Sequence, residues 1–308
     1  MALLRVNGID IAYERSGDPR GAPVLLVMGL GMQLVAWPED FVEGLGELGF
    51  NVIRFDNRDS GLSSKFRQAG KPNLPWTWLK SFVHWPLHPP YTLDDMASDA
   101  VGLLNALGIG RAHVVGVSMG GMIGQVLAAR YPDRVLSLTS IMSSSGRRGL
   151  PGPTREARTA LLRRPRNLKD RAALIEHMVS LMRTIGSPAY PLPERLLRQR
   201  IARALARNIC PDGVARQMVA IAASGDRSEM LRGVRAPTLV IHGAEDPLIP
   251  LQCGIDTASQ VPDARLEVIE GMGHDLPPAL TERLLALIDA HTRGKMLPDP
   301  IPRLFEKQ

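Results

Sequence analysis

The stretch Ala112-His113-Val114-Val115-Gly116-Val117-Ser118-Met119-Gly120-Gly121-Met122 decides the fold class. An apolar run typical of a buried strand leads into the pattern Gly-x-Ser-x-Gly, and a run with helical spacing follows it. This order lifts the hydroxyl of Ser118 out of a sharp turn for which Gly116 and Gly120 make room. The N–H of Met119 then lies at a helix N-terminus, where it can stabilise a negative oxygen. We interpret Ser118 as a candidate nucleophile and Met119 N–H as a candidate oxyanion donor.

A serine nucleophile needs a base and an acid, because its hydroxyl is a poor nucleophile at neutral pH. After a strand–turn–helix serine of this kind, the order along the chain is an acid and then a histidine, each following a strand. The strand at 238–241 runs into a polar loop with Glu245 and Asp246, and the strand at 266–269 runs into a glycine-flanked His274. We predict Asp246 as the acid and His274 as the base, with Glu245 as the competing acid.

A second oxyanion donor is expected in the loop after the strand at 23–28, because an oxyanion hole needs two N–H groups. This loop reads Gly29-Leu30-Gly31-Met32. We choose the N–H of Leu30, since Gly29 and Gly31 permit backbone geometry that a Cβ would block. Both glycines are also expected to line the substrate site.

Strands and helices alternate along most of the chain. Buried-type strands are predicted at 23–28, 51–56, 112–117, 135–142, 238–241 and 266–269, after a hairpin over 4–13 that turns at Asn7-Gly8. Helices are predicted at 41–48, 92–107, 118–130 and 281–291, with Thr92 as an N-cap. This alternation predicts a mostly parallel sheet flanked by helices.

The alternation stops between about 143 and 235, where the pattern is helical and rich in arginine. We predict a core formed by residues 1–145 and 236–296, a helical cap inserted at 146–235, and a C-terminal tail at 297–308. From 147 to 235 the chain has 19 Arg and Lys against 7 Asp and Glu, although the whole chain of 308 residues carries only +6. Because these arginines alternate with apolar residues at helical spacing, we interpret them as solvated helix faces rather than a nucleic-acid surface.

Several classes of protein are disfavoured by the sequence. Apolar runs fall short of the ~18 residues that a membrane span needs, and the N-terminus lacks the apolar stretch of a signal peptide. Cys210 and Cys253 lie far apart without metal-ligand spacing. We expect a cytoplasmic protein with reduced thiols and no metal.

Residues 65–91 form an unusual segment that holds three of the four tryptophans. A long loop beside strand ends often carries binding residues. We predict a loop and a short helix packed on the body, with Trp76 and Trp85 contacting substrate.

The chain resembles the α/β-hydrolase fold family over nearly its whole length. The resemblance is carried by the serine turn, Asp246-Pro247, Gly273-His274, and the stretch Asp56-Asn57-Arg58-Asp59-Ser60-Gly61-Leu62-Ser63-Ser64, which is similar to the D-x-R-G-x-G-x-S turn of these enzymes. Val27-Met28-Gly29-Leu30-Gly31 with Trp37-Pro38 resembles the aclacinomycin methylesterase-like carboxylesterases. The resemblance implies a Ser-His-Asp esterase with a helical cap and no cofactor. Most relatives have His-Gly where this chain has Met28-Gly29, which puts the orientation of Leu30 in question.

The sequence therefore predicts a serine carboxylesterase that acts on small to medium apolar esters through an acyl-enzyme. A C–C bond hydrolase or a cofactor-free haloperoxidase would keep the same three residues. The alternative from a different class is a non-catalytic receptor for a small ligand on the same fold. The presence of all three triad residues argues against the receptor. The serine at 118 argues against a dehalogenase or an epoxide hydrolase, because both need a carboxylate nucleophile on this fold.

Overall fold

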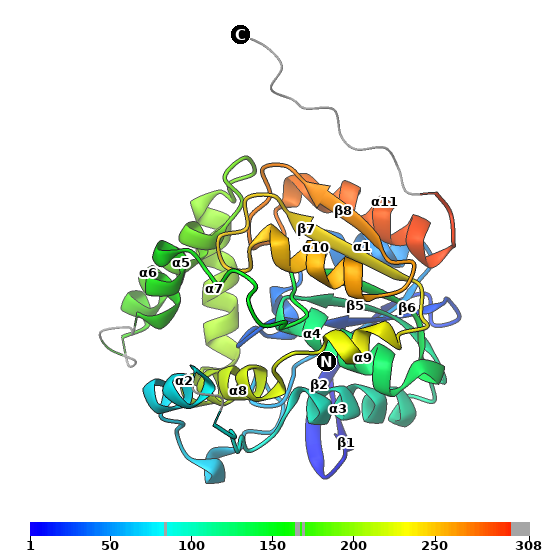
Figure 1. Cartoon of the computed structure of the whole chain (residues 1–308). Coiled ribbons are helices and arrows are strands. Elements are labelled where there is room, and N and C mark those ends of the chain that lie inside the picture. The colour runs from blue at the N-terminus through cyan, green and yellow to red at the C-terminus, as the bar shows by residue number, and fades with distance from the viewer. Residues whose placement is uncertain (83–84, 164–166, 168–169, 297–308) are drawn as a thin grey trace.

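In the computed structural model, which describes residues 1–82, 85–163, 167 and 170–296, a central sheet carries helices on both faces (Figure 1). The strand order is β1-β2-β4-β3-β5-β6-β7-β8. The strands are β1 (Ala2–Val6), β2 (Ile9–Gly17), β3 (Pro23–Val27), β4 (Asn51–Phe55), β5 (Ala112–Val117), β6 (Val135–Ile141), β7 (Thr238–Gly243) and β8 (Arg265–Ile269).

The antiparallel edge of the sheet is the predicted N-terminal hairpin. Strands β1 and β2 pair in antiparallel register and turn at Asn7-Gly8, where both residues have positive φ (50° and 80°). That geometry suits an Asn-Gly turn because Asn and Gly tolerate the left-handed region. Strand β2 pairs antiparallel with β4, and every later pair is parallel.

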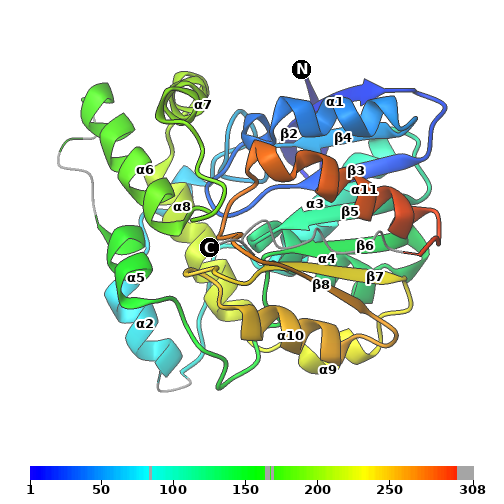
Figure 2. The ribbon, with the colours of Figure 1, turned by 90° about the horizontal axis from the view of Figure 1, so that it is seen from above.

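Two helical layers bury the two faces of the sheet (Figure 2). One layer holds α1 (Glu39–Glu47) and α11 (Thr281–Thr292); the other holds α3 (Leu93–Ala106), α4 (Met119–Arg130) and α10 (Leu251–Gln260). Thr92 caps α3 as predicted, because its side chain accepts from the N–H of Asp95 while that carboxylate accepts from the N–H of Thr92.

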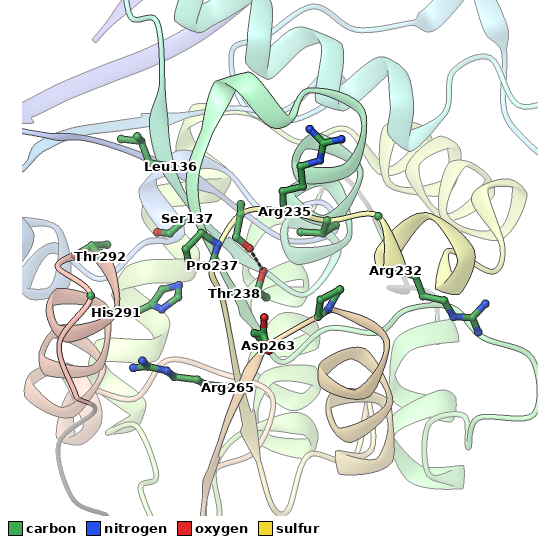
Figure 3. Close-up of a pocket in the computed structure, with 15 residues that line it drawn as sticks. Leu136, Ser137, Arg232, Arg235, Pro237, Thr238, Asp263, Arg265, His291 and Thr292 are labelled. Atoms are coloured by element: carbon green, nitrogen blue, oxygen red, sulfur yellow. Dashed lines mark hydrogen bonds between the residues drawn. The ribbon is translucent and has the colours of Figure 1, made fainter.

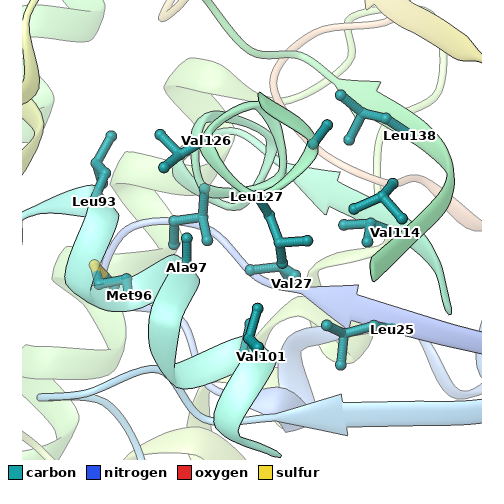
Figure 4. Packing of buried hydrophobic residues seen from close by; sticks show 14 of the residues in the cluster. Leu25, Val27, Leu93, Met96, Ala97, Val101, Val114, Val126, Leu127 and Leu138 are labelled. Atoms are coloured by element: carbon teal, nitrogen blue, oxygen red, sulfur yellow. The ribbon is translucent and has the colours of Figure 1, made fainter. Parts of the chain in front are cut away.

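The period of two along each strand divides the apolar residues between the two layers. In β3, Leu25 and Val27 join the cluster under α3 and α4, whereas Val24 and Leu26 face α1 and α11. Figure 4 shows the first cluster, in which side chains of β3, β5 and β6 meet the two helices: Leu25, Val27, Val114, Leu138, Leu93, Met96, Ala97, Val101, Val126 and Leu127. Burial on both faces explains why the central strands read as continuous apolar runs.

The helical insert follows β6 and contains α5 (Arg155–Leu162), α6 (Arg171–Ile185), α7 (Glu194–Arg207), α8 (Pro211–Ser224) and α9 (Ser228–Arg232). Figure 2 shows α5 to α8 grouped beyond one end of the sheet, beside α2 (Leu74–Phe82). Helix α9 instead contacts α4 and α10 on the core. The division into core and cap at 145/146 and 235/236 remains a proposal, and the tail at 297–308 lies outside the described residues.

The fold class and the predicted strands are confirmed. The ends of the six later strands differ by at most two residues, whereas the N-terminal hairpin extends over 2–17 rather than 4–13. Helix α10 was not predicted: its sequence, LQCGIDTASQ, has few apolar residues and a glycine at its fourth position. Gly254 is needed there because a Cβ would lie 2.4 Å from Nδ1 of His242. Tertiary packing, rather than intrinsic propensity, favours this helix.

Candidate active site

Ser118 stands at a strained turn between β5 and α4. Its φ of 56° and ψ of −119° are unusual for a residue with a side chain. The N–H of Ser118 donates to the carbonyl of Ile141 at 2.9 Å, and Oγ of Ser143 donates to the carbonyl of Ser118 at 2.8 Å. The two glycines are required by space, since a Cβ at Gly116 would lie 2.2 Å from the carbonyl oxygen of Gly120. The surroundings therefore hold the serine in its strained conformation.

Two hydrogen bonds connect Ser118, His274 and Asp246. Nε2 of His274 lies 3.0 Å from Oγ of Ser118, and Nδ1 lies 2.7 Å from Oδ2 of Asp246. A carboxylate can only accept, so Nδ1 carries the proton and Nε2 is left as the acceptor for the serine hydroxyl. This is the arrangement that a nucleophile, its general base and an orienting acid require.

The carboxylate of Asp246 is fixed by its own loop. Oδ1 accepts from the N–H groups of Leu248 and Ile249 at 2.9 and 2.8 Å, and the side chain is fully buried. His242 lies behind it, with Nε2 at 3.6 Å from Oδ2 of Asp246 and at 2.7 Å from the carbonyl of Ile249. Burial lowers the pKa of His242 below its usual value. His242 therefore packs beside the acid and directs its hydrogen bond to the carbonyl of Ile249.

The other acidic residues near His274 form hydrogen bonds with other partners. Glu245, the competing acid, accepts the N–H of Gly271 at 2.5 Å. Asp275 accepts from both the N–H and the hydroxyl of Ser187 in the insert. Burial raises the pKa of the Asp275 carboxyl. Of these carboxylates, Asp246 is the one that reaches the imidazole.

The proposed oxyanion donors flank the nucleophile. Residues 29–32 form a turn in which Met32 N–H donates to the carbonyl of Gly29 at 3.1 Å and Gly31 has a φ of 67°. A Cβ at Gly29 would lie 3.3 Å from Cβ of Ser118, so the turn lies against the nucleophile. Among the hydrogen bonds of the described residues, none takes up the N–H of Leu30 or of Met119. Both donors are available, and their role in holding an oxyanion is a proposal.

Arginines of the insert form buried ion pairs with the turn at 56–64. Arg207 of α7 donates to both oxygens of Asp56 at 3.3 and 3.0 Å. Arg216 of α8 donates to both oxygens of Asp59 at 2.7 and 2.8 Å and is 1% exposed. The prediction that the insert's arginines lie on solvated faces is therefore wrong for these two, and also for Arg227, which is 3% exposed. Periodicity places a residue on a helix face but does not reveal a carboxylate partner beneath it.

The predicted tryptophan contacts remain untested. Trp76 on α2 is 55% exposed and stacks under the ammonium of Lys80 at 5.6 Å, and Trp85 is 64% exposed. Helix α2 itself contacts α8. The predicted short helix in this segment is present, but within the described residues no hydrogen bond or ring contact joins either ring to Ser118. Residues 83–84 lie outside the described part of the chain.

A surface hollow of about 840 Å³ lies at the end of the sheet opposite to the one that carries Ser118 (Figure 3). It is lined by residues at the starts of β6, β7 and β8, such as Ser137, Thr238 and Arg265. Arg232 and Arg235 also line the hollow, and their side chains point away from each other. Since Ser118 follows the end of β5, this hollow is not part of the candidate active site.

Neither a metal cluster nor a membrane-spanning helix is found within the residues that the structure describes. No group of three or more His, Cys, Asp or Glu side chains there could hold a metal ion. No helix there is long and apolar enough to cross a membrane. Both cysteines are free thiols.

Comparison with known proteins adds the family. The model of the alpha/beta hydrolase fold matches residues 22–277. The chain belongs to this family. It is 33% identical to rhodomycin D methylesterase of Streptomyces sp. strain C5, over 95% of this chain and 98% of that protein. It is 30% identical to a 2-hydroxy-6-oxononadienedioate/2-hydroxy-6-oxononatrienedioate hydrolase of Burkholderia vietnamiensis, over 86% and 85% of the two chains.

Among solved structures, the meta-cleavage product hydrolase CumD of Pseudomonas fluorescens IP01 matches with a TM-score of 0.74 and 21% identity, over 96% of this chain and 98% of that one. This likeness bears on the fold. With the family and the relatives above, the chain is a serine hydrolase of the α/β-hydrolase fold.

Proposed function

We propose that this protein hydrolyses small to medium, largely apolar carboxylic esters through an acyl-enzyme on Ser118. The observation that carries the proposal is the hydrogen-bonded series Ser118–His274–Asp246, at 3.0 and 2.7 Å. The order of these residues along the chain and the strained turn at Ser118 support it.

The reaction uses side chains, backbone N–H groups and water. Nε2 of His274 takes the hydroxyl proton as Ser118 attacks the ester carbonyl, and Asp246 stabilises the imidazolium that forms. The N–H groups of Leu30 and Met119 hold the oxyanion. His274 then gives its proton to the departing alcohol, and a water activated by the same imidazole releases the acid.

The relatives support the proposed substrate class. The 33%-identical relative is a methylesterase and aligns along nearly the full length of both chains. We therefore expect methyl esters to be turned over, with Gly29 and Gly31 beside the reacting carbonyl and Trp76 and Trp85 at the mouth of the site. The segment at 65–91 is expected to set the preference for the acyl part.

The test is hydrolysis of a panel of esters by the purified protein and by S118A. The panel holds p-nitrophenyl esters of graded acyl length and methyl esters of graded acid size. We expect short p-nitrophenyl esters and methyl esters to be hydrolysed by the wild type, and S118A to lose at least about 1,000-fold in kcat. Retention of most of the turnover by S118A overturns the mechanism.

A second candidate is hydrolysis of a C–C bond with the same triad. It is favoured by the 30%-identical relative, whose name gives 2-hydroxy-6-oxononadienedioate as a substrate. A vinylogous 1,5-diketone in the panel tests it. Cleavage of this diketone with kcat/KM above that of every ester assigns the protein to the second candidate. Peracid-dependent bromination above ester turnover points instead to haloperoxidase activity. Absence of all turnover and of fluorophosphonate labelling, together with tight binding of a small ligand, supports a receptor.

A further inference from the structure

The turn that carries Leu30 is held from both sides by buried amide side chains. Nδ2 of Asn57 donates to the carbonyl of Met28 at 3.1 Å, on the side that precedes the turn. Oε1 of Gln217 accepts the N–H of Gly31 at 2.8 Å, on the side that follows Leu30. Gln217 is 0% exposed and belongs to α8 of the insert, far from the turn in sequence.

The hydrogen-bond partners of Gln217 fix the orientation of its amide. Nε2 donates to the carbonyl of Arg58 at 2.8 Å and to Oγ of Ser60 at 3.1 Å. The carbonyl of Arg58 cannot donate and the N–H of Gly31 cannot accept, so a flipped amide would lose both bonds. The side chain thus joins the turn at 58–60 to the turn at 29–32 in a single orientation.

The backbone of Gln217 is also immobilised. The preceding residue, Arg216, makes the two-bond ion pair with Asp59, and its Nη1 donates to the carbonyl of Gly70 at 2.6 Å. A bidentate pair of this kind fixes the position of the arginine side chain in addition to stabilising the contact. Gln217 therefore connects two core turns through hydrogen bonds in a fixed geometry, although it lies on an inserted helix.

The bond from Gln217 occupies the N–H of Gly31 and leaves that of Leu30 available. It also fixes the peptide that follows Leu30, in a turn that lies against Ser118. An oxyanion donor must stand at a defined place, because a displacement of about 1 Å can cost on the order of 100-fold in rate. We propose that Gln217 is a positioning residue that sets the place of the Leu30 N–H in the oxyanion hole.

This inference rests on the proposed ester hydrolysis, and it also explains how a chain with Met28 in place of the usual histidine keeps its turn in place. The side chain of Met28 is buried and apolar. It offers no hydrogen bond of the kind a histidine could make. The two amides, Asn57 and Gln217, hold the backbone on either side of Leu30 instead.

The test compares Q217M with Q125M as a matched control. Gln125 is equally buried, on α4, and its Oε1 accepts from Nε of Arg227 at 3.2 Å, and no hydrogen bond among the described residues joins it to the turn at 29–32. Both changes put the same side chain in place of a fully buried amide. A purely structural role for Gln217 would make both variants lose thermal stability with similar effects on kinetics.

We expect Q217M to lower kcat about 10- to 100-fold relative to Q125M, with KM for the p-nitrophenyl ester changed less than threefold. Binding of a trifluoromethyl ketone, which forms an oxyanion on a serine nucleophile, should weaken by a similar factor. Binding of the matching methyl ketone, which forms little of that adduct, should stay within twofold. This split between the two ketones is a readout that loss of stability alone would not produce.

Values of kcat and of trifluoromethyl ketone affinity within twofold of those of Q125M overturn the inference. If Q217M does not fold, Q217A removes the same bond without adding bulk, and the same criteria apply to it. S118A distinguishes a failure of the proposed function from a failure of the role of Gln217. Full activity in S118A refutes the proposed function, whereas an inactive S118A with an unaffected Q217M refutes only the role of Gln217.

Discussion

Asp246 and Glu245 are neighbours on the loop after β7, yet their carboxylates have different partners. Asp246 reaches Nδ1 of His274 at 2.7 Å, and Glu245 turns to the N–H of Gly271. The difference follows from the backbone, because two N–H groups of the same loop hold the other oxygen of Asp246 in place. An acid positioned in this way orients the imidazole and stabilises its charge in the transition state.

The D246N variant tests this assignment. Its amide can donate to Nδ1 and so favour the wrong tautomer of His274, and we expect kcat to fall on the order of 10⁴-fold with little change in KM. The matched control, E245Q, keeps an acceptor for Gly271 and should stay within about threefold of wild type. The measurement is hydrolysis of p-nitrophenyl butyrate. A larger loss in E245Q than in D246N would assign the acid to Glu245.

Hydrogen bonds join the insert to three of the loops that carry proposed catalytic groups, those of Asp246, His274 and Leu30. Thr154 N–H donates to the carbonyl of Pro247 beside the acid at 2.8 Å. His274 N–H donates to the carbonyl of Ile185 at 2.7 Å, and Gln217 holds the turn of Leu30. The helical insert therefore helps to hold the loops of the candidate site. Helix α8 is anchored by the pair of Arg216 with Asp59.

The D59N variant measures that anchor. It leaves the guanidinium of Arg216, which is 1% exposed, without its carboxylate, and we expect the free energy of unfolding at pH 7 to fall by about 3–5 kcal/mol. The control is D10N, which breaks an exposed pair with Arg5 and should cost about 0–1 kcal/mol. Urea unfolding compares the variants. Equal losses in D59N and D10N would contradict the anchoring role.

The same pair predicts a pH dependence. Burial raises the pKa of Asp59, but hydrogen bonds from Arg216 and Tyr91 outweigh it, so the pKa in the folded protein lies below its usual value. The contribution of the carboxylate is then fully present above its unfolded pKa of about 4 and is lost as the pH falls through the lower folded value. The gap in stability between wild type and D59N should hold down to about pH 4 and shrink below it. A gap that grows on acidification contradicts the assignment.

Over the whole molecule, the sequence indicates the sheet and the three residues of the proposed triad more readily than the contacts that support them. Continuous apolar runs identify buried strands, and parallel strands bring their carboxyl ends to one edge. Ser118, Asp246 and His274 could therefore be chosen from strand-end loops alone. Helix α10 was missed because its sequence has few apolar residues and a glycine at its fourth position.

The role of Gln217 could not be read from the sequence, because its partners lie in turns that meet α8 only in the folded chain. The buried arginines were misread for the same reason, since a helix face shows no sign of a distant carboxylate. Local pattern thus indicates the proposed reacting groups, and long-range packing determines what holds them.

The most direct test of the central claim is to trap the acyl-enzyme. The protein is mixed with p-nitrophenyl butyrate, quenched in acid within the first turnovers, digested, and analysed by mass spectrometry. We predict a butyryl group on the peptide that contains Ser118, formed within the burst of p-nitrophenol and absent from S118A. A wild-type enzyme that turns over the ester without an adduct on Ser118, or with the adduct on Cys210 or Cys253 and full activity in S118A, would contradict the account.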